Sequence, residues 1–214
     1  METVVILDYG MSNLRSVAKA LEFISSGKQR VLVSGSVADL KRADRVVFPG
    51  QGAIGDCMRH LLVLGLVTSL QECVRTKPFL GICLGLQSLM HYSEEGNGTA
   101  GLGIYEGQVV RFRPDLRDPK TGERLKIPHM GWNQIWPTQS HPLWDGIEPG
   151  SRFYFVHSYY VKPTRQDLIV ATTDYGGAFT SAIARDNVFA VQFHPEKSQR
   201  AGLQLLANFL SWDV

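Results

Sequence analysis

The chain has 214 residues, of which 44% are hydrophobic and 20% are charged, and its formal net charge is +2. A chain of this length buries about 70% of its unfolded surface, so we expect a single domain over residues 1–214. It contains no block of basic residues, so we expect no nucleic-acid partner. No apolar run approaches the roughly 18–20 residues of a membrane span, and the opening apolar run is too short for a secretory signal. We therefore expect no membrane partner and a cytoplasmic location.

The first half of the chain alternates between short β-branched runs and amphipathic stretches. We expect buried strands over residues 3–8, 30–34, 45–48 and 79–82. Between them we expect helices after a cap at Ser12, over 56–75 and over 84–92. This alternation predicts an α/β fold with a mostly parallel central sheet flanked by helices.

The second half of the chain has a different pattern of predicted elements, with several strands in succession. We expect strands over residues 107–112, 152–161, 168–172, 180–184 and 188–193, and a final helix over 198–210. The short gaps between the later strands predict hairpins, and therefore an antiparallel or mixed extension of the sheet. Residues 113–126 are rich in charge, proline and glycine, which predicts a solvated loop or hairpin tip, and we assign this segment no function.

The three cysteines, Cys57, Cys73 and Cys83, are odd in number, and no two of them form a C-x-x-C pair. This argues against a disulfide framework and against a zinc knuckle, so we expect no metal and no other cofactor. Isolated cysteines in an α/β core are most often structural, which is our interpretation of Cys57 and Cys73. The remaining question is whether Cys83 is reactive.

Cys83 lies between a predicted buried strand and a predicted helix, with Gly81 and Gly85 two positions on either side. This is the spacing of a nucleophile elbow, with cysteine in place of serine. A sharp strand-to-helix turn strains the nucleophile and brings these two positions close together, where glycine avoids a clash. The helix start favours the thiolate, and the N–H group of Leu84 is well placed to receive a developing oxyanion. We predict that Cys83 is a nucleophile.

A thiol nucleophile needs a base, and the base needs an orienting partner. His194 directly follows the predicted strand over 188–193, so it is expected at the same sheet edge as Cys83. Pro195 should keep the backbone extended, which would direct Glu196 to the same side as His194. The order Cys83, His194, Glu196 then predicts a triad, and the alternative is a solvent-facing His-Pro turn.

Residues 50–55 match the pattern G-x-G-x-x-G, which taken literally predicts a dinucleotide site. We reject that interpretation because Pro49 separates the strand from the first glycine. In addition, the acidic residue expected about twenty positions later falls inside a helical stretch. The backbone of Gly50, Gln51 and Gly52 is better suited to face an oxyanion beside Cys83.

These motifs resemble the class I (triad) glutamine amidotransferases. The resemblance rests on the sequence Gly-Ile-Cys-Leu-Gly around Cys83, on Gln87, and on His194-Pro195-Glu196. Three further segments resemble the glutaminase subunits of imidazole glycerol phosphate synthase, and the resemblance covers nearly the whole chain. They are residues 8–17, 128–133 and 153–159.

The resemblance implies a reaction and a partner. Cys83 would attack the side-chain amide of glutamine to give a thioester and ammonia, with His194 as base and acid and Glu196 as its orienter. Water would then release glutamate. The ammonia would pass to a cyclase subunit with a (β/α)8 barrel, which makes imidazole glycerol phosphate and aminoimidazole carboxamide ribotide in histidine biosynthesis.

The resemblance also implies substrate contacts. Gln87 lies one helical turn after Cys83 and would hydrogen-bond the bound glutamine. The backbone of Ser158 and Tyr159 would hold its α-amino and α-carboxyl groups, and Gly50 and Gln51 belong to the oxyanion loop of the family.

Four positions match residues that face the cyclase in the family: Asn13, Arg15, Trp132 and Lys197. The competing interpretations are a helix N-terminal turn for Asn13 and Arg15, a core aromatic for Trp132 and a solvated charge for Lys197. The sequence also departs from the family at Gln51, where valine is usual.

Met11 and Ser12 also stand where the family commonly has glycine, and residues 113–126 are longer than is typical. Two other functions stay open at this point. One is a stand-alone cysteine hydrolase of γ-glutamyl or peptide bonds, and the other is a catalytically silent binding subunit.

Overall fold

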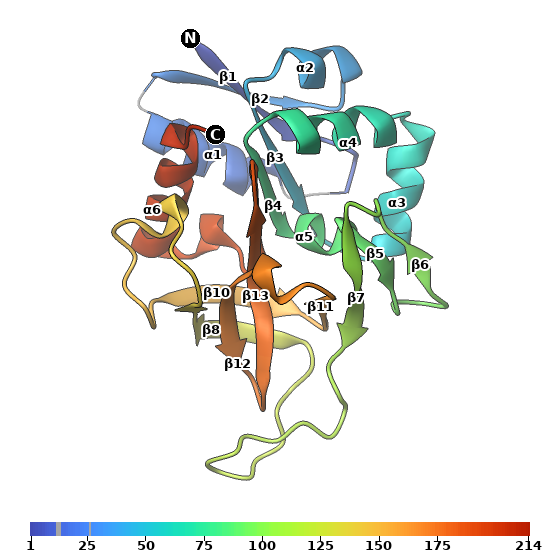
Figure 1. Ribbon diagram of the computed structural model, residues 1–214, viewed down its shortest axis with the longest axis vertical. Helices are drawn as coiled ribbons and strands as arrows, with labels where there is room; N and C mark the ends of the chain where they lie inside the picture. Colours follow the sequence, from blue (N-terminus) through green and yellow to red (C-terminus); the bar gives the residue numbers. More distant parts are fainter. Residues whose placement is uncertain (12–13, 26) are drawn as a thin grey trace.

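A computed structural model describes residues 1–11, 14–25 and 27–214. The predicted helix cap Ser12 and the predicted partner-facing residue Asn13 lie outside the described residues. Twelve strands of the described part form one sheet, and two more form a separate ribbon (Figure 1).

The parallel half of the main sheet confirms the strands expected in the first half of the chain. Its order is β2-β1-β3-β4-β14, and every neighbouring pair in this run is parallel. These strands are β1 (Glu2–Leu7), β2 (Gln29–Ser34), β3 (Arg45–Gly50), β4 (Phe79–Cys83) and β14 (Val188–Val191). The strands β3, β4 and β14 are buried along their whole length, as expected of parallel strands covered on both faces.

Helices cover the two faces of this parallel half (Figure 1). On β1, Val4 and Ile6 belong to the core under α1 (Leu14–Ser25) and α6 (Gln199–Ser211). The alternate residues Val5 and Leu7 belong to the opposite core. That second core lies under α2 (Val37–Arg42), α3 (Ile54–Val63) and α4 (Val67–Thr76). The alternation follows from the two-residue period of a strand.

The second half of the chain extends the sheet with mostly antiparallel strands, as predicted. The order continues from β14 through β13, β11, β7, β5 and β6, with β12 and β9 branching from β13. Only β5 and β7 pair in parallel in this part of the described chain. The bounds are β5 (Met90–Ser93), β6 (Thr99–Ala100), β7 (Tyr105–Arg111), β9 (Trp136–Pro137), β11 (Tyr159–Pro163), β12 (Ile169–Asp174) and β13 (Ala178–Arg185).

Strands β8 (His129–Gln134) and β10 (Arg152–His157) form the separate antiparallel ribbon. Three short 3-10 turns complete the described part of the fold, namely η1 (Pro142–Trp144), η2 (Gln166–Leu168) and η3 (Pro195–Lys197). Because β4 of the first half pairs with β14 of the second, and α6 packs against α1, we propose that residues 1–214 act as one domain.

The prediction of a single helix over residues 56–75 is wrong. The chain forms two helices, α3 and α4, which meet at an angle of 101°. Gly65 has φ +66°, and the bonds Leu66 N–H to Leu61 O and Gly65 N–H to Leu62 O close a Schellman cap. No single helix in the described part of the chain is long and apolar enough to cross a membrane, and only this bent pair passes on combined length and composition.

Two other expected elements are shorter than the sequence indicates. The helix expected over 84–92 ends after α5 (Leu84–Ser88), because Met90 enters β5 and pairs with Tyr105 of β7. The strand expected over 152–161 divides at Ser158, and its halves join different sheets as β10 and β11.

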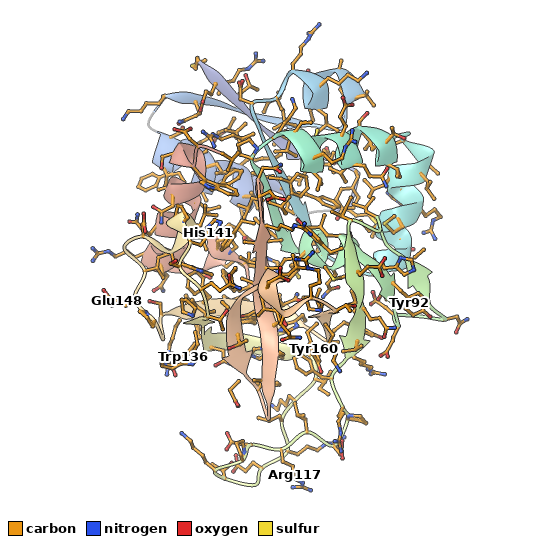
Figure 2. The ribbon with its side chains drawn as sticks, viewed as in Figure 1. Tyr92, Arg117, Trp136, His141, Glu148 and Tyr160 are labelled. Atoms are coloured by element: carbon orange, nitrogen blue, oxygen red, sulfur yellow. The ribbon has the colours of Figure 1, made fainter. Side chains whose placement is uncertain are left out.

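Sequence reasoning also missed α2 and β8, whereas its expectation for residues 113–126 is confirmed. Ser36 caps α2 by accepting a hydrogen bond from the N–H group of Ala38. Residues 113–126 form an extended loop with one isolated bridge between Arg117 and Arg124 (Figure 2).

We expect Gly85→Ala to lower the free energy of unfolding by about 2–3 kcal/mol, because the backbone atoms that the added methyl group would meet cannot move without distorting the strand. A Cβ atom at Gly85 would lie 1.9 Å from the carbonyl oxygen of Phe48. The matched control is Gly55→Ala in α3, whose Cβ would come no closer than 3.5 Å to another atom. Urea unfolding of both variants measures the difference, and equal midpoints would contradict this account of the turn.

Candidate active site

Cys83 occupies a strained turn at the end of β4. Its φ is 55° and its ψ is −106°, although it is not a glycine, and α5 begins at the next residue. A Cβ atom at Gly81 would lie 3.2 Å from the carbonyl carbon of Gly85, so the two glycines are close together. The close packing expected of an elbow is therefore present. The N–H group of Leu84 is among the helix-start donors that have no intrahelical partner.

His194 and Glu196 follow β14, which runs parallel to β4. The Nδ1 atom of His194 lies 2.8 Å from Oε1 of Glu196, and the two side chains are 7% and 4% exposed. The carboxylate accepts, so Nδ1 carries the hydrogen, and the buried Nε2 atom has no partner of hydrogen-bonding geometry among the described residues. The expected extended backbone at Pro195 is wrong, because residues 195–197 form the turn η3, but this turn still brings Glu196 against His194.

The charges at this site favour a protonated His194. Burial alone opposes the imidazolium, but the interactions of His194 with Cys83 and Glu196 outweigh it and raise the pKa of His194 to about 10. The other two cysteines are buried in the core. Burial raises the pKa of Cys57 to about 11 and also raises the pKa of Cys73, so both stay protonated at neutral pH.

A cavity of about 370 Å³ opens beside Cys83 and is lined by most of the predicted site residues. These are Gln51, Gly52, Cys83, Leu84, Gln87, Ser158, Tyr159, His194 and Lys197. Gly50 and Glu196 do not line it, but they line a much smaller space that shares Gln51, His194 and Lys197 with it. Sequence reasoning missed four lining residues, which are Glu95, Pro128, Val156 and His157.

Gln87 is already engaged by neighbouring groups. Its Nε2 atom donates to the carbonyl oxygen of Tyr159 at 3.0 Å and to Oε1 of Gln192 at 3.1 Å. Gln192, which sequence reasoning missed, also donates from Nε2 to the sulfur of Cys83 at 3.5 Å. Its position two residues before His194 on an extended segment was a usable signal, because such residues share one face.

A buried histidine pair supports the wall of the cavity formed by Tyr159. His157 Nδ1 lies 2.8 Å from the Tyr159 carbonyl, which can only accept, so Nδ1 carries the hydrogen. His157 Nε2 then accepts from His129 Nδ1 at 3.0 Å, and His129 Nε2 accepts from the Asn133 amide at 3.2 Å. Both rings are therefore neutral, and burial lowers the pKa of His129 to about 4 and that of His157 to about 3.

The described residues that match the family's partner-facing positions are exposed. Trp132 is 43% exposed on β8, with its ring against that of Tyr154 at a centroid distance of 6.0 Å. This excludes the core-aromatic interpretation of Trp132. Arg15 and Lys197 are also exposed, and Lys197 lies at the rim of the cavity.

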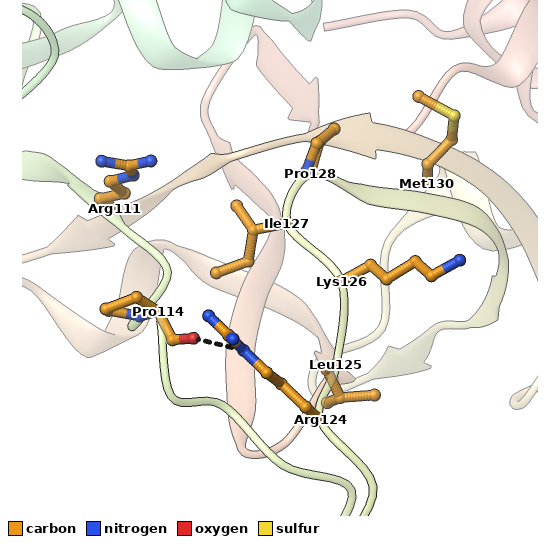
Figure 3. A pocket seen from close by; sticks show the side chains of 8 residues that line it. All are labelled: Arg111, Pro114, Arg124, Leu125, Lys126, Ile127, Pro128 and Met130. Atoms are coloured by element: carbon orange, nitrogen blue, oxygen red, sulfur yellow. Dashed lines mark hydrogen bonds between the residues drawn. The ribbon is translucent and has the colours of Figure 1, made fainter.

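A larger cavity of about 760 Å³ lies beside the loop 113–126, and it contains none of the reactive side chains (Figure 3). Arg111, Arg124 and Lys126 line it, and it shares only Pro128 with the cavity at Cys83. Within the described residues, no group of three or more His, Cys, Asp or Glu side chains is arranged to hold a metal ion.

The family model for class-I glutamine amidotransferases matches residues 5–212. The chain belongs to this family. It is 56% identical over 212 residues to the imidazole glycerol phosphate synthase subunit HisH of Aromatoleum aromaticum, covering 99% of each chain. It is 55% identical over 211 residues to the protein of the same description from Dechloromonas aromatica, covering 99% of this chain and 97% of that one.

The solved structures agree on the fold. A protein from Thermoplasma acidophilum, described as belonging to a GMP synthase, superimposes with a TM-score of 0.69 at 17% identity. The superposition covers 99% of this chain and 93% of that one. The class I glutamine amidotransferase fold expected from the sequence is therefore confirmed, and the chain is a HisH-type subunit of imidazole glycerol phosphate synthase.

The buried histidine pair should make the fold sensitive to acid. Below the ordinary histidine pKa of 6.5 the unfolded chain binds protons at His129 and His157, whereas the folded chain resists them down to about 4 and about 3. The free energy of unfolding should therefore fall as the pH falls below 6.5, by up to about 1.4 kcal/mol per pH unit for each histidine.

Urea unfolding between pH 6.5 and 5 measures this slope. We expect His157→Gln to flatten it, while His91→Gln on the exposed side of β5 leaves it unchanged. Equal slopes for the two variants would show that the buried pair does not control the acid response.

Proposed function

We propose that this chain, as the glutaminase subunit of an imidazole glycerol phosphate synthase in histidine biosynthesis, works through a triad of Cys83, His194 and Glu196. The observation that carries this proposal is the placement of all three at one sheet edge. There the cysteine lies in a strained turn and the His194 imidazole is held by Glu196 at 2.8 Å. The 56% identity to a HisH subunit over nearly the full length supports the same chemistry.

The proton on His194 determines how the first step proceeds. With its pKa raised to about 10, His194 is an imidazolium beside Cys83 at neutral pH. The thiolate attacks the side-chain carbonyl carbon of glutamine, and His194 gives its proton to the leaving nitrogen, so that ammonia departs and a thioester remains. His194 then takes a proton from water as it attacks the thioester, and glutamate leaves with the thiolate restored.

The cavity provides groups that suit a zwitterionic amino acid. Among its lining residues, Glu95 is the only carboxylate, and we propose that it faces the α-ammonium group. The Tyr159 carbonyl already accepts hydrogen bonds from Gln87 and His157, so it is not a ready acceptor for the substrate. The N–H group of Tyr159 and Ser158 remain to bind the α-amino and α-carboxyl groups of the substrate. Gln87 retains its Oε1 atom as an acceptor.

We propose that the oxyanion is received by backbone N–H groups at Leu84 and in the loop Gly50-Gln51-Gly52. The β3–β4 register places Gly50 directly opposite Cys83. A Cβ atom at Gly50 would lie 2.7 Å from Cβ of Leu84, so only glycine lets the loop approach this closely. The Gln51 side chain is exposed at the cavity mouth, so the departure from valine leaves the core unchanged.

We propose that the partner is a cyclase subunit with a (β/α)8 barrel, which takes the ammonia and forms a heterodimer with this chain. The exposed side chains of Arg15, Trp132 and Lys197 form the candidate interface, and Lys197 joins it to the cavity. We also propose that the complex works in the cytoplasm, because all three cysteines are free thiols.

Cys83→Ala should lower glutamine-dependent turnover of the complex by more than about 10³-fold, because no other group can form the thioester. Turnover supplied with ammonium salts should stay unchanged, since the cyclase site is intact. Cys73→Ala is the matched control and should retain both activities, because Cys73 is buried in the core away from the cavity. Continued glutamine hydrolysis by Cys83→Ala would refute the nucleophile assignment.

Trp132→Ala should weaken binding of the cyclase subunit by about 30-fold, the loss typical of a buried interface tryptophan. Trp136→Ala is the control, because Trp136 is 47% exposed on β9 (Figure 2) but matches none of the partner-facing positions. Calorimetric titration of each variant with the cyclase measures the affinity. Equal losses for the two variants would remove Trp132 from the interface.

Activity assays on the isolated chain and on the complex distinguish this proposal from a stand-alone hydrolase. The isolated chain should hydrolyse glutamine slowly and accelerate when cyclase and its ligand are added. Rapid turnover of γ-glutamyl peptides without any partner would favour the alternative.

A further inference from the structure

Gln192 is held beside Cys83 by strands on both sides. The β4–β14 register pairs Val191 with Ile82, so the next residue of each segment, Gln192 and Cys83, are neighbours. The N–H group of Gln192 donates to the carbonyl of Ser181 on β13 at 2.9 Å. Its side chain is fully buried.

The orientation of the Gln192 amide follows from the Tyr159 carbonyl, which fixes the orientation of Gln87 between them. The Tyr159 carbonyl can only accept, so Gln87 must direct its NH2 group toward it. The same NH2 group lies 3.1 Å from Gln192, which must therefore present its oxygen to Gln87. The NH2 group of Gln192 is then left to face the sulfur of Cys83 at 3.5 Å.

We propose that Gln192 is a further catalytic residue of the glutaminase, whose Nε2–H group donates to the Cys83 sulfur and stabilises it as a thiolate. This inference rests on the proposed function of Cys83. The thiolate is the nucleophile when the thioester forms and the leaving group when it is hydrolysed. A carboxamide donor does not give up its proton at neutral pH, so it stabilises the sulfur in both steps without protonating it.

Gln192 and His194 have different tasks in this arrangement. His194 also acts on Cys83, but its proton moves to the leaving nitrogen during the reaction. Glu196 hydrogen-bonds to His194, and Glu95 and Lys197 line the same cavity as Cys83. Gln192 is the neutral member of the set, held in place by Gln87.

The test compares Gln192→Met, which removes the donor at similar length, with Gln192→Glu, which replaces it by a carboxylate of the same shape. The rate at which iodoacetamide alkylates Cys83 is followed against pH by mass spectrometry of the assembled complex. Cys57 and Cys73 are buried with raised pKa values, so they react slowly and do not obscure Cys83.

We expect the midpoint of the alkylation profile to rise by about one pH unit in Gln192→Met and further in Gln192→Glu. Glutamine-dependent turnover should fall about tenfold or more, the effect of losing one hydrogen bond to a charged group. Turnover supplied with ammonium salts should stay within twofold. The matched control is Gln71→Met, which removes a partly buried amide hydrogen bond to the Leu102 carbonyl outside the cavity at Cys83 and should change none of these quantities.

An unchanged alkylation profile in both variants would overturn the proposal even if turnover fell, because Gln192 would then act only through the packing of Gln87. Failure of both variants to assemble with the cyclase would overturn it as well, since it would show a structural role. If Cys83 of the unaltered complex is not alkylated at any pH, the proposed function itself fails.

Discussion

The parallel pairing of β4 with β14 is the constraint on which the site depends. It brings the ends of two strands from opposite halves of the chain to the same edge of the sheet. Cys83 ends one strand, while Gln192 and His194 follow the other and alternate with the buried core residue Phe193. A register shift of one residue would direct Gln192 and His194 to the opposite face.

The site departs from ordinary structural rules at several atoms that lie close together. Cys83 has a positive φ without being a glycine, and the buried atoms His194 Nε2 and Glu196 Oε2 are among those without a hydrogen-bond partner in the described part of the chain. Such departures are tolerated only where the surroundings hold them firmly. Here the support comes from glycines packed against backbone, from the β3–β4–β14 register and from the turn η3.

The ribbon of β8 and β10 serves both the cavity and the candidate interface. On β8, Met130 and Trp132 point outward and are exposed. The alternate residues His129 and Asn133 point inward, where they join the hydrogen bonds that hold His157 and the Tyr159 carbonyl. The two faces of one strand therefore carry the proposed partner contact and the support of the proposed substrate site.

The sequence by itself determined the features that depend on local spacing. The elbow around Cys83, the strand–helix alternation of the first half and the His-Pro-Glu segment can be read from residues a few positions apart, because strained turns and buried strands restrict composition locally. Tertiary structure decided where periodicity was ambiguous. Apolar spacing continues through Gly65, yet the chain bends there, and Met90 leaves the expected helix because β7 offers a strand partner.

Tertiary structure alone decided which distant groups meet. Glu95 lines the cavity through the packing of its loop, and the β4–β14 register brings the buried Gln192 side chain to the Cys83 sulfur. Glu196 reached its predicted partner through the turn η3, although the predicted backbone at Pro195 was wrong. A side-chain contact is determined by the sum of many long-range packing terms, whereas a turn is determined by the few residues within it.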